Sequence, residues 1–359
     1  MSENTNTTKR RSAIQIMGSL IGLVKPLLHI MLAAIILGTL GYLCAIFLTI
    51  LAGQVIMHGL LTGVAGMIVP VDNMWRVFTP VKTIITVMIV IAVLRGILHY
   101  VEQYCNHFIA FKLLAIIRHK VFAALRKLCP AKLEGRDKGN LISIITTDIE
   151  LLEVFYAHTI SPIAIATLTS IIMVIFIGRY HWLAGVIALV AYLIVGVVIP
   201  MWNGKRGSQK GMEFRTNFGE LNSFVLDSLR GLDETIQYGQ GEKRKEQMSE
   251  HSKNLAGMQE SLSKMEGSQR SFTNMVILLA SFGMLALTIW LYDKGAMGFE
   301  GILTCTIAMM GSFGPVVALS SLSNNLNQTL ASGERVLSLL EETPLVEEIP
   351  GDVETPGTE

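Results

Sequence analysis

Six long hydrophobic segments, separated by polar connections, organise the chain. Each is about 20 residues long or longer, which is the length a helix needs to cross the roughly 30 Å hydrocarbon core of a bilayer. The segments are residues 26–53, 81–110, 158–177, 182–202, 272–292 and 299–322. The pattern predicts an all-α polytopic membrane protein with six transmembrane helices. The apolar stretch between the first two, Val55 to Trp75, leaves one alternative open: a re-entrant or interfacial segment rather than a seventh span.

Two of the connections are long and rich in helix-forming residues, whereas the turns GRYH and DKGAMG on the other side are short. Apolar residues recur at helical spacing beyond the second span, which predicts that this helix continues out of the membrane. About 25 extra residues would add on the order of 35 Å. We therefore expect two long helical hairpins outside the bilayer. The apolar residues that recur at helical spacing beyond the second span form a stripe of Phe108, Phe111, Leu114, Ile117, Val121 and Leu125.

Composition and charge support this architecture and give it an orientation. Hydrophobic residues make up 51% of the 359-residue chain and charged residues only 16%, with a mean hydropathy of +0.50. Of the 29 basic residues, 24 lie in the two ends and the two long connections. The positive-inside rule therefore predicts that both termini and both hairpins are cytoplasmic, in a cell (inner) membrane. The four cysteines show no pairing or metal-binding pattern, and the polar start of the chain is no signal peptide.

The second span contains the clearest candidate for a binding site. Arg95, His99 and Glu102 stand at helical spacing and share one face. Charged groups in hydrocarbon are costly and usually face a cavity or a partner helix. Arg95 could bind a substrate carboxylate and Glu102 a substrate amine; alternatively, the two pair with each other or with a neighbouring helix. Neither catalytic residues nor a metal site is expected.

The sixth span contains two glycines and a proline, Gly311, Gly314 and Pro315. These residues predict a kink or a loosened backbone within the membrane. The kink is either a hinge for alternating access or a detail of packing.

Three segments resemble the transmembrane domain of an exporter-type (type IV) ATP-binding-cassette, or ABC, transporter. GNLISIITTDIELLE (139–153) is similar to the first coupling region of that family, VLDSLRGLDETIQYGQGEKR (225–244) to the second, and ASGERVLSLLEETP (331–344) to the linker toward a nucleotide-binding domain. The resemblance implies a cytoplasmic tail and elbow helix (1–24), a six-helix domain (25–330) and a linker (331–359). It also implies coupling regions at about 130–150 and 215–240 that dock on ATPase domains. The coupling residues it implies are Lys138, Gly139, Asn140, Ser143, Asp148, Asn217, Asp227 and Gly231.

Leu94 to Leu133 and the variant LDETIQYGQ more closely resemble the CydC-like half of the thiol-reductant exporters. That resemblance implies a heterodimer of half-transporters that exports cysteine or glutathione, with haem as a bound modulator. The haem-associated histidine falls on His107, whereas Gln103 stands where the family has an arginine.

No Gly-x-x-x-x-Gly-Lys-Ser/Thr loop occurs in the sequence, so these residues cannot hydrolyse ATP. ATP and Mg²⁺ are expected on a nucleotide-binding domain that either belonged to a longer chain or is a separate polypeptide. The sequence thus predicts the permease part of an ATP-driven exporter of a small solute. The alternatives are a lipid, drug or peptide exporter of the same fold and a haem-binding membrane sensor. The expected partners are the nucleotide-binding domain, a second half-transporter and the bilayer, but no nucleic acid.

Overall fold

A computed structural model describes residues 11–344, except 12, 24, 64–80, 131 and 134–137. In the described part every regular element is helical, as the hydrophobic pattern predicts. The chain divides into two compact units, each built from segments that are far apart in the sequence. The first unit comprises residues 1–32, 104–160 and 326–359, and the second comprises residues 33–103 and 161–325.

Six helices of the described part are long and apolar enough to cross a bilayer, which confirms the predicted number of spans. The apolar helical stretches are Lys25–Met57, Lys82–Leu128, Leu141–Gly178, Trp182–Gly204, Gly241–Asp293 and Phe299–Leu319. The first long helix, α2 (Leu28–Gly63), continues ten residues past the predicted end of the first span. The rest of the stretch up to Trp75 lies outside the described residues.

The membrane core of the second unit is formed by α2, α3 (Val81–Leu128), α6 (Ser161–Gly178), α7 (Trp182–Leu193) and α11 (Phe299–Gly311), with parts of α10 (Gly241–Asp293) and α12 (Gly314–Leu340). Its buried side chains are mostly aliphatic or small, including Ile46, Met173, Ala184, Ala188 and Met284. Small residues let two helices approach closely. A Cβ at Gly185 of α7 would lie 2.9 Å from the Cα of Gly178, at the end of α6. The short turn between α6 and α7 therefore holds them in backbone contact.

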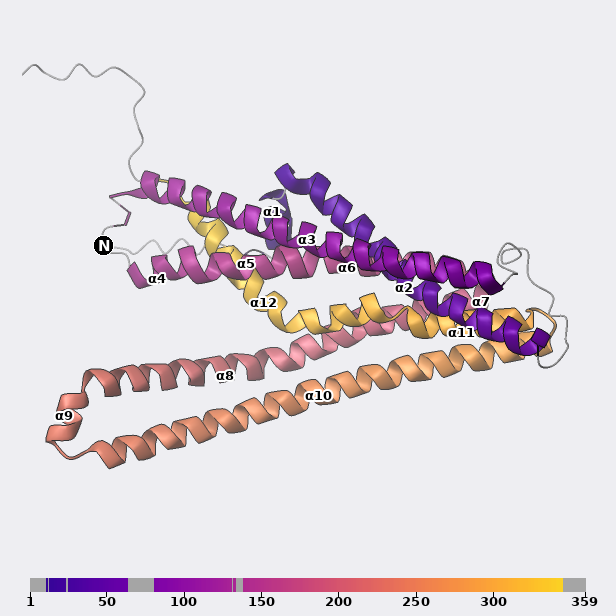
Figure 1. The fold of residues 1–359 in the computed structure, drawn as a ribbon. Helices are drawn as coiled ribbons and strands as arrows, with labels where there is room; N and C mark the ends of the chain where they lie inside the picture. Colours follow the sequence, from indigo (N-terminus) through magenta and orange to yellow (C-terminus); the bar gives the residue numbers. More distant parts are fainter. Residues whose placement is uncertain are drawn as a thin grey trace, which may run out of the picture. The chain divides into compact units, whose positions relative to one another are not determined.

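A long two-helix hairpin extends the second unit. It consists of α8 (Ile199–Arg230), the short helix α9 (Leu232–Gln237) at the tip, and α10. The two long helices, α8 and α10, run side by side in opposite directions (Figure 1). With 53 residues, α10 is about 80 Å long. The two helices touch through Trp202 and Phe272 near the spans and through Phe224 and His251 toward the tip. The predicted helical continuation of the fourth and fifth spans is therefore present.

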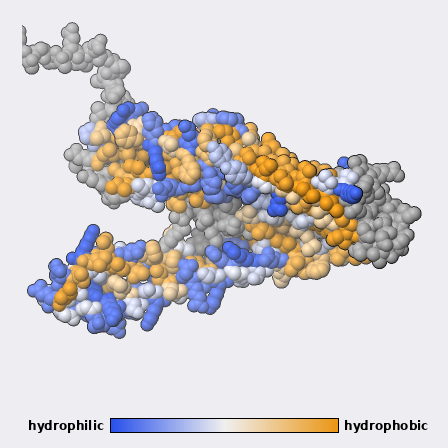
Figure 2. Space-filling model, viewed as in Figure 1, coloured by the Kyte–Doolittle hydropathy of each residue, from blue (hydrophilic) through white to orange (hydrophobic). Residues whose placement is uncertain are grey.

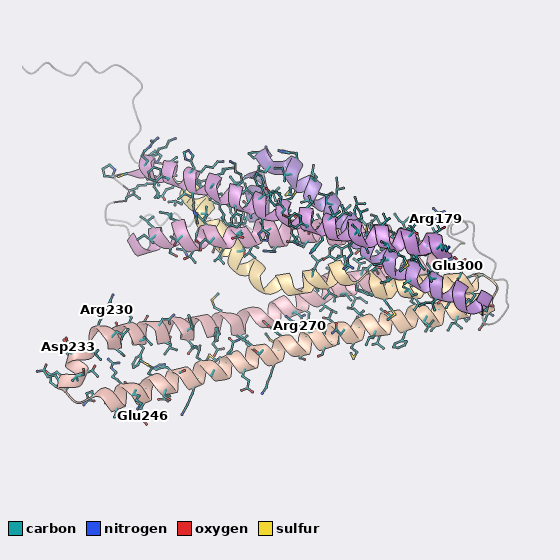
Figure 3. All side chains as sticks on the ribbon, in the orientation of Figure 1. Arg179, Arg230, Asp233, Glu246, Arg270 and Glu300 are labelled. Carbon is teal, nitrogen blue, oxygen red and sulfur yellow. The ribbon has the colours of Figure 1, made fainter. Side chains whose placement is uncertain are left out.

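Hydrophobic and charged residues divide along this second unit. Figure 2 shows hydrophobic surface gathered over the apolar part of α10 and α11, and a hydrophilic surface with hydrophobic patches along the hairpin. Arg230, Asp233 and Glu246 lie near the tip of the hairpin, whereas Arg179 and Glu300 lie at the opposite end of the apolar helices (Figure 3). The charged residues thus lie on both sides of an apolar zone, as a membrane protein requires.

The first unit packs α1 (Ala13–Leu23) and the last turns of α12 against the outer parts of two long helices. One is α3 from Tyr104 onward; the other is a continuous run made of α4 (Lys138–Ser143), a π-helix (Ile144–Asp148), α5 (Ile149–Phe155) and a second π-helix (Tyr156–Ile160). Tyr156 donates a hydrogen bond from its hydroxyl to the Leu20 carbonyl, at 3.0 Å. The core includes Leu113, Ile117, Leu152, Phe155, Val336 and Leu337.

The second span continues as a helix, as the stripe predicts, because α3 runs unbroken to Leu128. Leu114, Ile117 and Val121 are buried, but Phe108 and Phe111 are exposed. The buried face of α3 instead runs through Ile109 and Leu113, because α3 presents that face to its neighbours in the first unit.

Candidate functional site

The charged triplet of the second span does not converge on one point. Glu102 is 5% exposed, while Arg95 and His99 lie on the exposed surface of α3. Nδ1 of His99 lies 3.4 Å from Oε2 of Glu102, and Nε2 of Gln103 donates to the same oxygen at 3.1 Å. Among the described residues Arg95 forms no ion pair, so the alternative in which it neutralises Glu102 is not the arrangement in this structure.

Glu102 fits against α2 at a glycine. A Cβ at Gly38 would lie 2.4 Å from Cδ1 of Ile165 and 3.0 Å from Cγ of Glu102, so a larger residue would require both side chains to move. The next turn of α2 carries Tyr42. Its ring lies next to the sixth span, since a Cβ at Gly314 would be 3.6 Å from Cε1 of Tyr42. Tyr42 therefore lies beside the start of α12.

The sixth span is broken where the glycines and the proline predict a kink. α11 ends at Gly311 and α12 begins at Gly314, which leaves Ser312 and Phe313 outside regular helix. Ser312 donates its hydroxyl to the Met309 carbonyl at 3.1 Å, and Tyr192 of α7 hydrogen-bonds to the same Ser312 oxygen. The Tyr192 ring also meets Phe313 edge to face, with centroids 5.3 Å apart. A helix break inside a membrane frees backbone carbonyls, and Ser312 satisfies one of them.

The fourth span is irregular at the same place. A π-helix, Ile194–Val198, connects α7 to α8, and at Gly196 a Cβ would lie 2.9 Å from Cγ1 of Val316 on α12. Beside this contact, α6, α7 and α12 enclose an apolar groove of about 270 Å³. Thr167, Ser170 and Tyr192 are its polar lining residues. Sequence reasoning missed Tyr192 and Ser312, although a hydroxyl inside an apolar span that contains two glycines was a usable signal.

The predicted coupling residues occupy two kinds of environment. On the hairpin, Asp227 is exposed near the end of α8, Asn217 donates to the Glu213 carbonyl at 2.9 Å, and Gly231 separates α8 from α9. Asp148 is instead 4% exposed. Ser143 is partly buried, and Lys138, Gly139 and Asn140 form the first turn of α4, although their side chains lie outside the described residues.

His107 lies on α3 within the first unit. Its Nδ1 is 3.8 Å from Oε1 of Glu153, and its ring packs against Phe111 and, edge to face, against His158. Within the described ranges no three His, Cys, Asp or Glu side chains gather in a way that would hold a metal ion. Glu153 lies on the Nδ1 side of the His107 ring, and the His107 side chain is 44% exposed.

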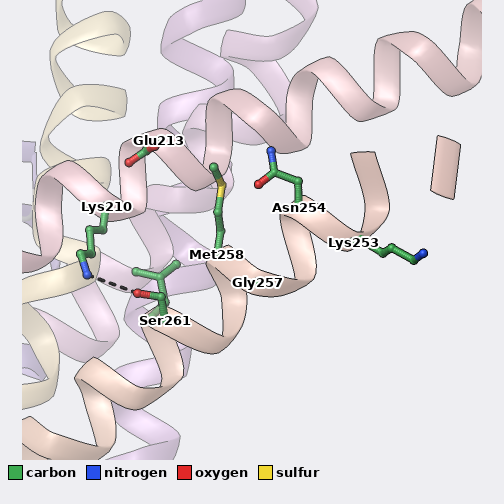
Figure 4. A pocket seen from close by; sticks show the side chains of 8 residues that line it. Lys210, Glu213, Lys253, Asn254, Gly257, Met258 and Ser261 are labelled. Atoms are coloured by element: carbon green, nitrogen blue, oxygen red, sulfur yellow. Dashed lines mark hydrogen bonds between the residues drawn. The ribbon is translucent and has the colours of Figure 1, made fainter. Parts of the chain in front are cut away.

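A polar pocket of about 480 Å³ opens between the two long helices of the hairpin (Figure 4). Lys210 of α8 crosses it and donates to the Ser261 hydroxyl of α10 at 3.2 Å. The pocket lies beyond the apolar parts of both helices and is lined by exposed lysines, so it is a solvated gap in the hairpin rather than a solute site. Its lining residues are Lys210, Glu213, Lys253, Asn254, Gly257, Met258, Ser261 and Leu262.

A comparison with known families assigns this arrangement of six spans and two helical extensions. The family described as the ABC transporter transmembrane region matches residues 27–316. The chain belongs to this family. As an ABC transporter transmembrane region it is a multi-pass membrane protein and the permease part of a transporter.

Similar proteins are ATP-dependent transporters, and the names of two of them give different substrates. A probable ABC transporter ATP-binding/permease protein of Haemophilus influenzae is 41% identical over 348 residues, which are 96% of this chain and 60% of that protein. The glutathione/L-cysteine transport system ATP-binding/permease protein CydC of the same organism is 22% identical over 72% of this chain and 45% of its own length. The ATP-dependent lipid A-core flippase of Escherichia coli is 23% identical over 75% and 47%. This ABC permease thus spans 60% of the first relative and less than half of the other two.

Proposed function

We propose that this chain is the permease of an ATP-driven exporter that moves a small carboxylate-bearing solute, such as cysteine or glutathione, out of the cytoplasm by alternating access. The observation that carries the solute class is Arg95, a guanidinium on the exposed face of a transmembrane helix without an ion-pair partner among the described residues. A charge in that position normally faces a water-filled cavity or a partner. A planar guanidinium binds a carboxylate through two parallel hydrogen bonds.

The orientation and the partners belong to the same proposal. The excess of basic residues in the ends and the long hairpins favours a cytoplasmic location for both, in the inner membrane. ATP with Mg²⁺ would bind a nucleotide-binding domain, fused or separate. The hairpin exposes large apolar side chains along its length, including Met212, Phe218 and Leu226, which favours a second half-transporter packed against it. Haem bound at His107 stays a separate prediction, and the transport proposal does not depend on it.

Transport into inside-out vesicles containing the complete transporter tests the solute. ATP-dependent uptake of labelled cysteine or glutathione is expected to fall roughly 10- to 100-fold in Arg95→Ala, the loss expected for a charge-assisted hydrogen-bonded contact. Arg95→Lys should recover only part of the uptake, since an ammonium lacks the guanidinium fork. Arg179→Ala, outside the apolar zone, serves as the matched control. Normal ATP hydrolysis without uptake of either thiol by the wild type would refute the thiol substrate.

The groove between α6, α7 and α12 favours a second candidate, an amphiphilic or lipid-like substrate. It is lined mainly by aliphatic side chains, and three of its lining residues carry a hydroxyl group. A lipid tail would fill such a space without needing Arg95. Uptake of a fluorescent lipid that depends on ATP and is unaffected by Arg95→Ala would favour this candidate over the thiol.

The tip of the hairpin is the proposed contact with the ATPase. Leu229, Ile236 and Tyr238 are 64%, 68% and 73% exposed, so the tip presents an apolar patch. Ile236→Asp should leave the melting temperature unchanged, yet reduce ATP-driven uptake at least about tenfold, because a buried charge at an interface is strongly unfavourable. Gln259→Asp, which introduces the same charge at an exposed polar position of α10 far from the tip in sequence, is the comparison. Equal uptake by the two variants would refute the assignment of the tip.

A further inference from the structure

The last turns of α12 are fixed inside the first unit rather than lying on its surface. Thr329, Leu330, Ser332, Val336, Leu337 and Leu339 are all buried. At Gly333 a Cβ would lie 2.9 Å from Cδ1 of Leu20 and 3.5 Å from Cδ2 of Leu152, so α12 passes tightly between α1 and α5. The end of the sixth helix is thus packed on two other elements.

One polar contact lies within this packing. Asp148, which ends the π-helix before α5, is 4% exposed, and its Oδ1 accepts a hydrogen bond from the Ser332 hydroxyl at 2.9 Å. Nη1 of Arg335 lies 3.0 Å from the other carboxylate oxygen. A buried carboxylate is strongly unfavourable unless it is paired and hydrogen-bonded. If α12 moved away from α5, Asp148 would lose both of its partners. The contact therefore favours the arrangement in which Ser332 and Arg335 stay next to Asp148.

Weaker ion pairs surround the same helix end. Lys132, after α3, lies 3.4 Å from Glu342, and Arg11, before α1, lies 3.8 Å from Glu334 and also pairs with Glu341. These pairs are partly exposed and each contributes little alone. The end of α12 is thus contacted from three separate segments, through Arg11, Lys132 and Asp148. Of these three residues, only Asp148 is buried.

We propose that Asp148, Ser332 and Arg335 form a clamp that makes the end of α12 and the α5 segment move as one rigid body. Asp148 then does not dock on an ATPase surface. It is a positioning residue, which transmits a displacement of the linker beyond α12 directly to the third span. This inference rests on the proposed function, because it needs an ATPase domain to move the linker.

Hydrogen exchange measured by mass spectrometry on the complete transporter in nanodiscs tests the clamp without knowledge of the substrate. The wild type, with and without ATP and vanadate, should show a nucleotide-dependent change in exchange both at α9 and at the turn between α6 and α7. In Asp148→Asn, which keeps the shape of the side chain and removes its charge, the change at the α6–α7 turn should fall by at least about half. The change at α9 and the rate of ATP hydrolysis should stay near the wild-type values.

Glu150→Gln is the matched control. Glu150 lies two residues after Asp148 and also forms an ion pair, with Arg118 at 3.5 Å, but this pair is on the exposed surface. Arg335→Gln removes the other half of the clamp from a side chain that is 42% exposed, and should reproduce the effect even if Asp148→Asn folds poorly. If Arg335→Gln behaves like Glu150→Gln, or abolishes ATP hydrolysis, the clamp is refuted. If the wild type neither hydrolyses ATP nor responds to it, the proposed function fails instead.

Discussion

Gly185→Val should leave little folded transporter. The position of a Cβ at residue 185 lies 2.9 Å from the Cα of Gly178, 3.3 Å from the Val174 carbonyl oxygen and 3.4 Å from the Gly178 nitrogen. All three are backbone atoms of α6 or its end, which cannot rotate out of the way as a side chain can. α6 and α7 would have to separate next to Ile177 and Ala184, which are buried in the core of the second unit.

The milder variant Gly185→Ala sets the scale of this effect. Overpacking usually costs about 1–3 kcal/mol, which should lower the melting temperature of the detergent-purified transporter measurably. Gly283→Ala is the matched control, because a Cβ at that glycine of α10 meets no atom within 4 Å. It should be neutral or slightly stabilising, since alanine favours a helix over glycine. A Gly185→Ala variant that melts with or above the wild type would show that the two helices do not meet here.

The second large loss of stability is expected from a substitution at Tyr192. This residue of α7 contacts the break in the sixth span. Tyr192 is 5% exposed and contacts both Ser312 and Phe313. Tyr192→Ala removes the ring and the hydroxyl together. It should destabilise the protein by on the order of 3–5 kcal/mol, the range for aromatic side chains removed from a core.

Tyr192→Phe separates the hydrogen bond from the packing. It keeps the ring against Phe313 and should cost only about 1 kcal/mol, the usual size of a hydrogen bond between membrane helices. If the break is a hinge, this small loss of stability should be accompanied by a clear change in ATP-driven transport. Ser312→Ala removes this contact and also the hydrogen bond to the Met309 carbonyl, so it should cost more than Tyr192→Phe. Combining the two should cost little more than Ser312→Ala alone, because both variants remove the same contact between Tyr192 and Ser312. Additive losses of stability and unchanged transport would favour the alternative, a detail of packing.

Much of this protein could be predicted from the sequence because bilayer thickness sets helix length. An apolar run of about 20 residues has essentially one stable conformation in hydrocarbon, so the six spans follow from hydropathy alone. The helical hairpins followed from the helical periodicity that continues past those spans. The kink at Gly311 to Pro315 was also predictable, since two glycines and a proline weaken a helix locally.

The candidate site was harder to predict. The spacing of Arg95, His99 and Glu102 placed them on one face, yet Glu102 is buried against Gly38 while Arg95 is exposed. A helix of constant pitch says which residues share a face, but the neighbouring helices decide which of them are covered. The exposed Phe108 and Phe111 follow the same rule, because amphipathic periodicity does not identify which side of a broad apolar face meets a partner.

The sequence by itself determined the fold class, the number of spans and the positions of the charges, because hydrocarbon imposes these locally on each segment. Only the tertiary structure decided that Ser332 and Arg335 contact Asp148, and that Tyr192 contacts Ser312. Asp148 and Ser332 are 184 positions apart in the sequence, and Tyr192 and Ser312 are 120 positions apart. Such contacts depend on which helices become neighbours and in what rotation. Many weak packing terms distributed over the whole chain set that choice, and no single segment encodes it.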